Sequence, residues 1–454
     1  MRLITGLGSI PLVLSLFACG GQEATLPEPT PPRNVVFVLV DTLRADHTTL
    51  NGYARSTTPF MEELAAESVV FVRARSQAGC TNPSMNSMLT SRYPFDFYSR
   101  GIADMGIPED YPSIAEILNT HGYFTAAISA SPIVRATPSK QNPSAGFGRG
   151  FDVFDETCLW KSAECVNKRA MEILEELPEP FFLYLHYMDP HDPYQPPKSH
   201  QRFSGSYDGF EFIAAGNPNP ISEMLYDDGP EIDVDDDDIQ HLVDLYDDEV
   251  FYFDAKLREL VHAFRDAGVL EDSIFIVTSD HGEEFLEHGH VKHCRGVWNT
   301  LTHIPLLIRA PNIKGGVHID TAVQALDLGP TILDLLELNT AQTEFEGRSL
   351  APLLEGAFTE ARYAFSDQVE YRSVDNGRFH LILDGLENTL TLFDIRTDEL
   401  EQVDAYSADH HELEPLALEL DDWLDRTGQR ARFDLALIAG KAQEEHLRAL
   451  GYLE

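Results

Sequence analysis

Residues 34–41 are Asn34-Val35-Val36-Phe37-Val38-Leu39-Val40-Asp41, an uninterrupted apolar run that ends in a carboxylate. Such a run is typical of a strand buried on both faces in a parallel sheet. A second run, Ser273–Thr278, has the same character and is followed by Asp280 and His281. Open α/β sheets bind ligands beyond the carboxyl ends of their strands, so both run ends are candidate site positions. The two runs predict an α/β fold with a large, mostly parallel central sheet flanked by helices.

The hydrophobic pattern along the rest of the chain predicts how the chain is divided into domains. From about residue 360 the pattern changes to shorter alternating runs, followed by a terminal helix that contains Trp423. We therefore expect a main domain over residues 34–358 and a smaller α+β subdomain over residues 359–454. Further strands are predicted at Val69–Val72, Tyr123–Ser129, Phe181–Leu185, Ile304–Ile308, His380–Leu383 and Leu390–Phe393, and helices at Thr58–Ala65, 111–119, 163–176, 239–266 and Asp327–Leu336.

A helix start is predicted around the hydroxyl residue Thr81. We expect Asn82 to be the N-cap and Pro83 the first helical residue. Such a start directs unpaired N–H groups and the positive end of the helix dipole toward Thr81, which suits a bound anion. A capped surface helix is the simpler interpretation of this stretch alone.

Two loops that follow predicted strands are rich in imidazoles and carboxylates. The first carries His186, Asp189, His191 and Asp192, and the second begins with Asp280-His281-Gly282. Oxygen ligands with one imidazole suit a Mg, Ca, Mn or Zn ion. An N-cap aspartate beside a surface histidine is the alternative interpretation of the second loop.

An acidic run at Asp235–Asp238 invites comparison with a calcium loop. It lacks the alternating ligands and the central glycine of an EF-hand. We therefore expect a solvated segment at this position.

The N-terminus has the pattern of an export signal. Arg2 precedes an apolar run, and Leu16-Phe17-Ala18-Cys19 resembles a bacterial lipobox, which would make Cys19 a diacylglycerol-modified residue. The apolar run Ile10–Phe17 is shorter than the roughly 20 residues that span a bilayer. A signal peptide is thus predicted over residues 1–19 and a proline-rich tether over residues 20–33. We expect an exported protein, lipid-anchored in the cell envelope at the outer membrane or in the periplasm.

The composition restricts the partners. The chain has 75 Asp and Glu against 33 Lys and Arg, a formal net charge of -42. This excess repels a polyanion and argues against nucleic acid. An anionic substrate would need local positive charge, which a metal ion supplies. Besides Cys19, the four cysteines are compatible with disulfides in an exported chain, and their spacing is not that of a zinc site.

These motifs together resemble the sulfatase family of the alkaline phosphatase superfamily, over nearly the whole chain beyond the tether. The stretches that carry the resemblance are Val40–His47, Thr81–Ser84 with Leu89–Pro94, Phe182–His186 with Asp189–His191, Ser279–Gly282, Gly347–Leu350 and Leu447–Leu453. The resemblance implies the fold of that superfamily and at least one divalent metal ion, Ca, Mg, Mn or Zn.

The resemblance also implies the roles of individual residues. Asp41, Asp280 and His281 would hold the metal, with the Thr81 side chain as fourth contact and nucleophile. His191 would hold the oxygens of the substrate and assist the leaving group. His293 or Lys292 would do the same from the loop after Asp280-His281.

The chain departs from the family pattern at the nucleophile. Sulfatases carry Cys or Ser there, oxidised to formylglycine, whereas Thr81 cannot form that product and Cys80 is one residue out of register. Met85 replaces the expected arginine, Thr42 replaces a second aspartate, and the Lys-Trp-His motif that grips sulfate is absent between Tyr123 and Ser131. Phosphodiesterases and phosphoethanolamine transferases of the superfamily do use threonine.

We therefore predict a metal-dependent hydrolase of sulfate or phosphate esters that favours phosphoesters. Its substrate would be an anionic ester of a small molecule or a glycan. The alternatives are a true sulfuric ester hydrolase of arylsulfatase type, a phosphoethanolamine-type transferase, and a non-catalytic protein that binds anionic glycans. Because the family brings their segments together, we also expect a Cys80–Cys294 disulfide, and a second between Cys158 and Cys165.

Overall fold

The computed structural model describes residues 33–98, 106–160, 162–209, 234–338, 344–357, 361–368, 370–387, 389–406 and 411–429. The predicted signal peptide, Cys19, most of the tether and the motif Leu447–Leu453 lie outside the described residues. Within the described residues, every helix is too short or too polar to cross a membrane.

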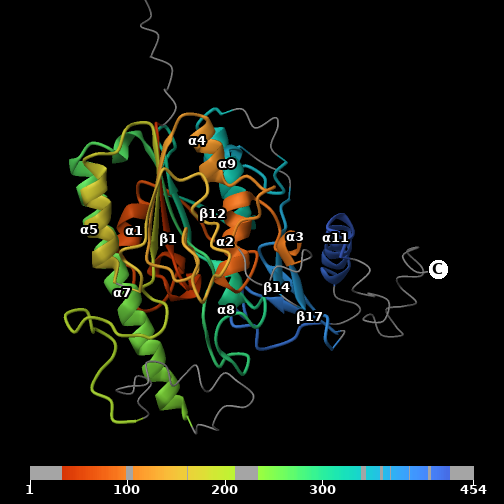
Figure 1. The fold of residues 1–454 in the computed structure, drawn as a ribbon. Helices are drawn as coiled ribbons and strands as arrows, with labels where there is room; N and C mark the ends of the chain where they lie inside the picture. Colours follow the sequence, from red (N-terminus) through yellow and green to blue (C-terminus); the bar gives the residue numbers. More distant parts are fainter. Residues whose placement is uncertain are drawn as a thin grey trace, which may run out of the picture. The chain divides into compact units, whose positions relative to one another are not determined.

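An eight-stranded sheet lies at the centre of the fold (Figure 1). Every neighbouring pair of strands is parallel except the two pairs made by β11, which runs against both β7 and β2. The predicted mostly parallel sheet is therefore confirmed. Its strand order is β12 (Val317–Ile319), β2 (Val69–Phe71), β11 (Leu306–Arg309), β7 (Ser273–Ser279), β1 (Asn34–Val40), β6 (Phe181–Tyr187), β4 (Phe124–Ser129) and β5 (Val153–Asp155).

Strand β1 separates two hydrophobic cores. Its alternate residues Val36, Val38 and Val40 pack with α1, α5 and α7, whereas Val35, Phe37 and Leu39 pack with α2, α4 and α9. Figure 1 shows these two sets of helices on the two sides of the sheet. Successive side chains of a strand point to opposite faces, so an entirely apolar strand must be covered on both.

The helices are α1 (Pro59–Ala65), α2 (Thr81–Thr90), α3 (Phe95–Tyr98), α4 (Ile114–Thr120), α5 (Ala163–Leu174), α7 (Asp236–Asp266), α8 (Asn299–Thr302), α9 (Leu328–Leu335) and α10 (Ala351–Leu354).

Short strands build two smaller sheets beside the large one. Strands β3 (Ala74–Arg75), β10 (His303–Ile304) and β13 (Val323–Gln324) form one, and β8 (Glu284–Phe285) and β9 (Val291–Lys292) form a hairpin. The strand predicted over Ile304–Ile308 is thus two strands in two sheets. The break lies at Pro305, which has no N–H to donate to a ladder.

The acidic run at Asp235–Asp238 is a helix start. The Asp235 side chain accepts a hydrogen bond from Asp238 N at 2.9 Å, and the Asp238 side chain accepts one from Asp235 N at 2.9 Å. This capping box begins α7, three residues before the predicted start of that helix.

A four-stranded antiparallel sheet and α11 (Leu413–Arg426) make up the smaller C-terminal part. Trp423 of α11 stacks on Phe365 with ring centroids 5.1 Å apart and meets Tyr93 edge to face at 5.2 Å. The predicted C-terminal subdomain is confirmed in kind, and its boundary at residue 358 stays a prediction. The strands are β14 (Ala364–Gln368), β15 (Tyr371–Asp375), β16 (Phe379–Asp384) and β17 (Thr389–Asp394).

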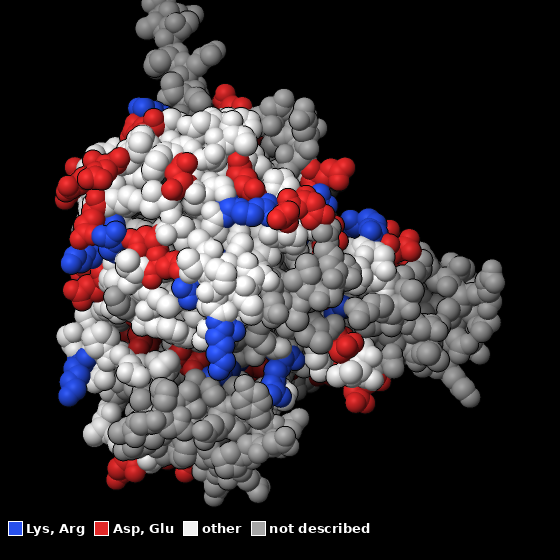
Figure 2. Space-filling view, in the orientation of Figure 1, with Lys and Arg blue, Asp and Glu red and all other residues white. Residues whose placement is uncertain are grey.

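Figure 2 shows the charged side chains on one face of the molecule. Asp and Glu gather over α5, with a few Lys and Arg among them. An anion that approaches such a surface needs a local source of positive charge.

Candidate active site

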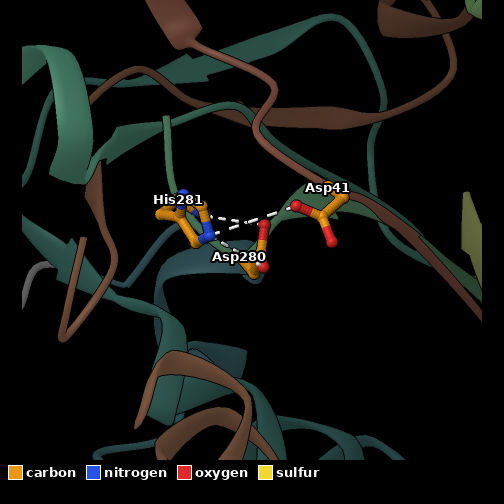
Figure 3. A group of neighbouring side chains, drawn as sticks. All are labelled: Asp41, Asp280 and His281. Carbon is orange, nitrogen blue, oxygen red and sulfur yellow. Dashed lines mark hydrogen bonds and ion pairs between the residues drawn. The ribbon is translucent and has the colours of Figure 1, made fainter. Parts of the chain in front are cut away.

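Three ligand candidates meet where the central strands end. Asp41 follows β1, and Asp280 and His281 follow β7, which pairs with β1 in register Val40 to Ser279. One donor atom from each residue lies within 4.8 Å of the other two (Figure 3). The predicted convergence of these side chains is therefore present in the fold.

Asp41 is oriented by a histidine from the neighbouring strand. His186, near the end of β6, contacts Asp41 Oδ2 through Nε2 at 3.2 Å, and its Nδ1 lies 2.8 Å from the Tyr184 hydroxyl. This arrangement leaves Asp41 Oδ1 buried without a hydrogen-bond partner. Burial alone raises the pKa of Asp41, but His191, His186 and His281 outweigh it and hold the pKa below its ordinary value.

Asp280 and His281 are held by backbone groups. Asp280 Oδ1 accepts hydrogen bonds from Thr42 N at 3.2 Å and from His281 N at 2.9 Å. His281 Nδ1 lies 2.8 Å from the Gly282 carbonyl, so Nδ1 carries the proton and Nε2 presents its lone pair. Burial lowers the pKa of His281, which keeps the ring neutral. Burial and the Asp41 carboxylate raise the pKa of Asp280.

The donor set fits a divalent cation. Asp41 Oδ1 and Asp280 Oδ2 are both buried without a hydrogen-bond partner, and both face His281 Nε2, at 4.0 and 3.3 Å. Two buried carboxylates that point at one lone pair are costly unless a positive charge joins them. Two hard oxygens and one imidazole nitrogen are ligands that Ca²⁺, Mg²⁺, Mn²⁺ or Zn²⁺ accepts. The residues present therefore fit the metal that the sequence resemblance implies.

Thr81 lies against this group at the start of α2. Its Oγ1 is 3.1 Å from His281 Nε2, and the residue is 5% exposed. The prediction of Asn82 as N-cap is wrong, because α2 begins at Thr81 with Cys80 as its N-cap. Ser84 N already donates to Cys80 O at 3.1 Å, and Pro83 fits the first turn, where an N–H needs no partner.

Hydrogen bonds from the serine after Pro83 fix α2 to the metal loop. Ser84 Oγ donates to Asp280 O at 2.6 Å and contacts Ser76 Oγ at 2.9 Å. Met85, which replaces the arginine expected at this place, is fully buried in the core beside α2. The nucleophile candidate is thus positioned without that arginine.

Both predicted disulfides are confirmed. Cys80–Cys294 joins Cα atoms 4.6 Å apart across a sequence separation of 214, and Cys158–Cys165 joins Cα atoms 5.7 Å apart. Cys294 N also donates to Gly79 O at 2.6 Å. The residue next to Thr81 is therefore bonded to the residue next to His293.

His293 and His191 extend the site outward. The ring centroid of His293 lies 4.7 Å from that of His281 and 5.2 Å from that of His191. Burial alone would lower the pKa of His293, but the Glu283 carboxylate, 2.9 Å from Nδ1, raises the pKa to about 9. His293 is therefore protonated at neutral pH.

Lys292 is paired with a carboxylate of the neighbouring loop. Its Nζ lies 2.9 Å from Asp192 Oδ2, and the carbonyl oxygen of Asp192 lies 2.7 Å from His191 Nδ1. Burial raises the pKa of Asp192, but His191 and Lys292 outweigh it and lower the pKa. Asp192 therefore connects two of the predicted site residues.

Three residues outside the predicted ligand and catalytic set support the site. His186 holds Asp41, Glu283 holds His293, and the Tyr246 hydroxyl donates to Thr42 O at 2.8 Å in the loop after β1. His186 had a sequence signal, because it ends a buried strand in a loop already rich in imidazoles. Tyr246 had none, because it lies within the apolar face of a long helix.

Two family models match this chain, and together they span residues 33–426. The family model described as Sulfatase matches residues 33–338, and that of the N-sulphoglucosamine sulphohydrolase C-terminal region matches residues 287–426. Arylsulfatase K of Gallus gallus is 24% identical over 413 residues, covering 76% of this chain and 71% of its own.

Several solved structures share the fold. Phosphonate monoester hydrolase of Agrobacterium radiobacter superposes with a TM-score of 0.69 at 19% identity, over 87% of this chain and 95% of its own. A protein solved in complex with its substrate D-glucosamine-2-N,6-O-disulfate gives a TM-score of 0.69 at 18% identity, over 87% of this chain and 98% of its own.

Proposed function

The chain belongs to the sulfatase family of ester hydrolases, and on that premise we propose that it hydrolyses phosphate esters with Thr81 as its nucleophile. The observation that carries this proposal is the position of Thr81. Its hydroxyl lies 3.1 Å from His281 Nε2 at the N-terminus of α2, beside the buried carboxylates of Asp41 and Asp280. A hydroxyl in this place needs activation, since a free alcohol is a poor nucleophile at neutral pH.

A divalent ion held by Asp41, Asp280 and His281 would lower the pKa of the Thr81 hydroxyl and offset the negative charge of the ester. Asp41 Oδ1 and Asp280 Oδ2, which are buried without a hydrogen-bond partner, are available to bind that ion. His186 keeps Asp41 in place, and the Gly282 carbonyl keeps the His281 tautomer.

Solvent and His293 carry the proton transfers. Thr81 gives its proton to solvent, and its oxygen attacks phosphorus while the bond to the leaving group breaks. His293, protonated at neutral pH, gives a proton to the departing oxygen. Water then attacks phosphorus, gives one proton back to His293, and displaces the Thr81 oxygen, which regains its proton from solvent as the phosphate product is released. His191 and Lys292 supply further hydrogen-bond donors for the non-bridging oxygens.

Threonine favours phosphorus over sulfur. A phosphothreonine can be hydrolysed by a second attack at phosphorus. A sulfothreonine lacks the second hydroxyl through which a formylglycine hydrate expels sulfate, so turnover of sulfate esters should stall. We expect kcat/KM for phosphate mono- or diesters to exceed that for matched aryl sulfates by about 10-fold or more, about 1.4 kcal/mol of transition-state preference.

The experiment compares matched 4-nitrophenyl phosphate, phosphodiester and sulfate substrates after loading with each candidate metal. Thr81→Ala should abolish turnover of all of them, whereas Thr81→Ser should retain it. Peptide mass spectrometry of enzyme quenched during turnover should detect phosphorylated Thr81. Multiple turnovers of the sulfate ester, faster than those of any phosphate ester, would disprove the nucleophile argument and favour a true sulfuric ester hydrolase.

We also propose export and a lipid anchor at Cys19. Two disulfides support this location, because disulfides persist in oxidising compartments. Cells fed a radiolabelled fatty acid should incorporate label into the wild-type protein and not into Cys19→Ala. Equal labelling of the two proteins would rule out the anchor.

A further inference from the structure

A tryptophan stands at the outer end of the row of rings in the site. The ring centroid of Trp160 lies 5.9 Å from that of His191, which is followed by His293 and then by His281. Trp160 is 50% exposed. The row therefore leads from the group around Asp41 to an apolar surface that solvent reaches.

We propose that Trp160 is a substrate-binding residue that packs against a six-membered ring in the leaving group of the ester. This inference rests on the proposed function, because it assigns the substrate class of the same site. An indole offers a broad apolar face, and both aryl rings and the C–H faces of sugar rings pack against such a face. The shared chemistry is thus a ring with an apolar face, attached to the ester oxygen.

The backbone holds this indole in an unusual conformation. Trp160 has a φ of 56°, in the left-handed region that bulky residues rarely adopt. Such a conformation is energetically costly and persists only where the surroundings impose it. Here Trp160 N donates to Ala130 O at 2.9 Å, which anchors the residue to the loop after β4.

A disulfide braces the same segment. Cys158, two residues before Trp160, is fully buried and bonded to Cys165 in the first turns of α5. The neighbouring Leu159 N donates to Glu156 O at 3.2 Å. A rigid, half-exposed aromatic loses little conformational freedom when a ligand packs on it, so the site is organised before binding.

The exposure of Trp160 is unusual for this protein. Of the large apolar side chains that are exposed in the described part of the chain, Trp160 alone is aromatic. The others are aliphatic, and Leu386 lies in the turn between β16 and β17 of the C-terminal sheet. Leu386, 66% exposed, therefore provides a matched control for the loss of an exposed apolar side chain.

The test compares esters that carry a phenyl leaving group, a glucopyranosyl leaving group or an acyclic alkyl leaving group. For Trp160→Ala we expect kcat/KM to fall about 10-fold for one or both ring esters, mainly through a higher KM, and to stay within about 2-fold for the alkyl ester. Trp160→Phe should recover part of the loss, and Leu386→Ala should match the wild type. A comparison of the losses for the phenyl ester and the glucopyranosyl ester shows which of the two rings the site binds.

Equilibrium binding gives a readout apart from turnover. By isothermal titration calorimetry, Trp160→Ala should weaken phenylphosphonate or a glycosyl phosphonate about 10-fold and leave methylphosphonate unchanged. Equal losses for ring and alkyl compounds, or no loss for either ring, would overturn the assignment. The kinetic comparison is made within the ester class that the wild type cleaves fastest. A sulfate preference would thus disprove the Thr81 argument and leave the Trp160 test intact.

Discussion

The inner group of the site and its rim are held in different ways. The inner group, Asp41, Thr81, Asp280 and His281, is at most 5% exposed and follows directly from the ends of β1 and β7 and the start of α2. In the rim, Trp160, His191 and His293 lie on loops, and Lys292 ends the short strand β9. Two rim residues have positive φ angles, 56° at Trp160 and 71° at Lys292.

This difference indicates that the inner group and the rim have different functions. The hydrogen-bond ladder of the central sheet fixes the inner group, since Val40 is paired both with Ser279 and with Tyr187. Disulfides and ion pairs between distant segments fix the rim. Inner variants should therefore abolish chemistry, while rim variants should change its rate and its selectivity.

The largest effect is expected for Asp280→Asn in the inner group. It removes one of the two charges that face His281 Nε2, so kcat/KM should fall about 1,000-fold or more. Added metal should raise the melting temperature of the wild type and not that of the variant. Asp272→Asn, at the other end of the same strand pair, is the control and should behave as wild type. If Asp280→Asn kept both its activity and the rise of its melting temperature with added metal, the inner group would not differ from the rim in the way proposed.

An intermediate effect is expected when the inner group is disconnected from the rim. Cys80→Ser with Cys294→Ser should lower kcat/KM about 100-fold, because Thr81 and His293 lose their covalent link. Loop closure over 214 residues suggests a loss of stability on the order of 5 kcal/mol. Denaturant unfolding measures that loss.

The second disulfide provides the matched comparison. Cys158→Ser with Cys165→Ser opens a loop with a sequence separation of only 7, so less stability is lost. The effect on activity should be confined to esters with ring leaving groups. Equal losses for alkyl and ring esters would show that this bridge supports more than the rim.

A smaller effect is expected within the rim ion pair. Lys292→Met and Asp192→Asn should each lower kcat/KM about 10-fold, because the two side chains hold each other at 2.9 Å. In a double-mutant cycle, the combined variant should lose less than the product of the single losses. Strictly multiplicative losses would mean that the two groups act independently.

The convergence of Asp41, Asp280 and His281 could be predicted from the sequence because these residues follow two strongly patterned strands, whereas Thr81 was assigned from the family resemblance. The runs that end at Asp41 and precede Asp280 are apolar throughout, and parallel strands place their carboxyl ends at one edge. The prediction of Asn82 as N-cap was wrong because it followed the local preference for asparagine over cysteine, whereas α2 begins at Thr81 with the disulfide-bonded Cys80 as its N-cap.

The rim was harder to predict because no regular strand or helix pattern shows how its loop side chains pair. The choice between His293 and Lys292 depends on Glu283 and Asp192, which select different partners only in the folded chain. Trp160 and Tyr246 lie in segments whose pattern is that of an ordinary loop and an ordinary helix. No local rule distinguishes these residues from their neighbours.

The smallest effect is expected for the pH dependence of stability at the base of the rim. Asp189 accepts a hydrogen bond from Ala163 N at 2.7 Å at the start of α5, and it is hydrogen-bonded to Glu249 of α7. Burial raises the pKa of Asp189 to about 6, and burial with the Asp189 charge raises the pKa of Glu249 well above its ordinary value.

The folded state therefore holds protons that the unfolded state releases, so stability falls as pH rises from about 4 through about 6. Asp189→Asn should reduce the difference in melting temperature between pH 5 and pH 8 by about 1–3 °C relative to the wild type. Differential scanning calorimetry at several pH values measures it. A variant whose melting temperature changes with pH as steeply as that of the wild type would exclude this pair as the cause.

The bond between Cys80 and Cys294 also makes one topological loop of everything between them. A single proteolytic cut at any point from residue 81 to residue 293 leaves the two fragments covalently joined, with Thr81 on one and His293 on the other. A nicked preparation should therefore migrate as one band on a denaturing gel until a reductant is added. Full-length migration without reductant is thus no proof of an intact chain in this protein.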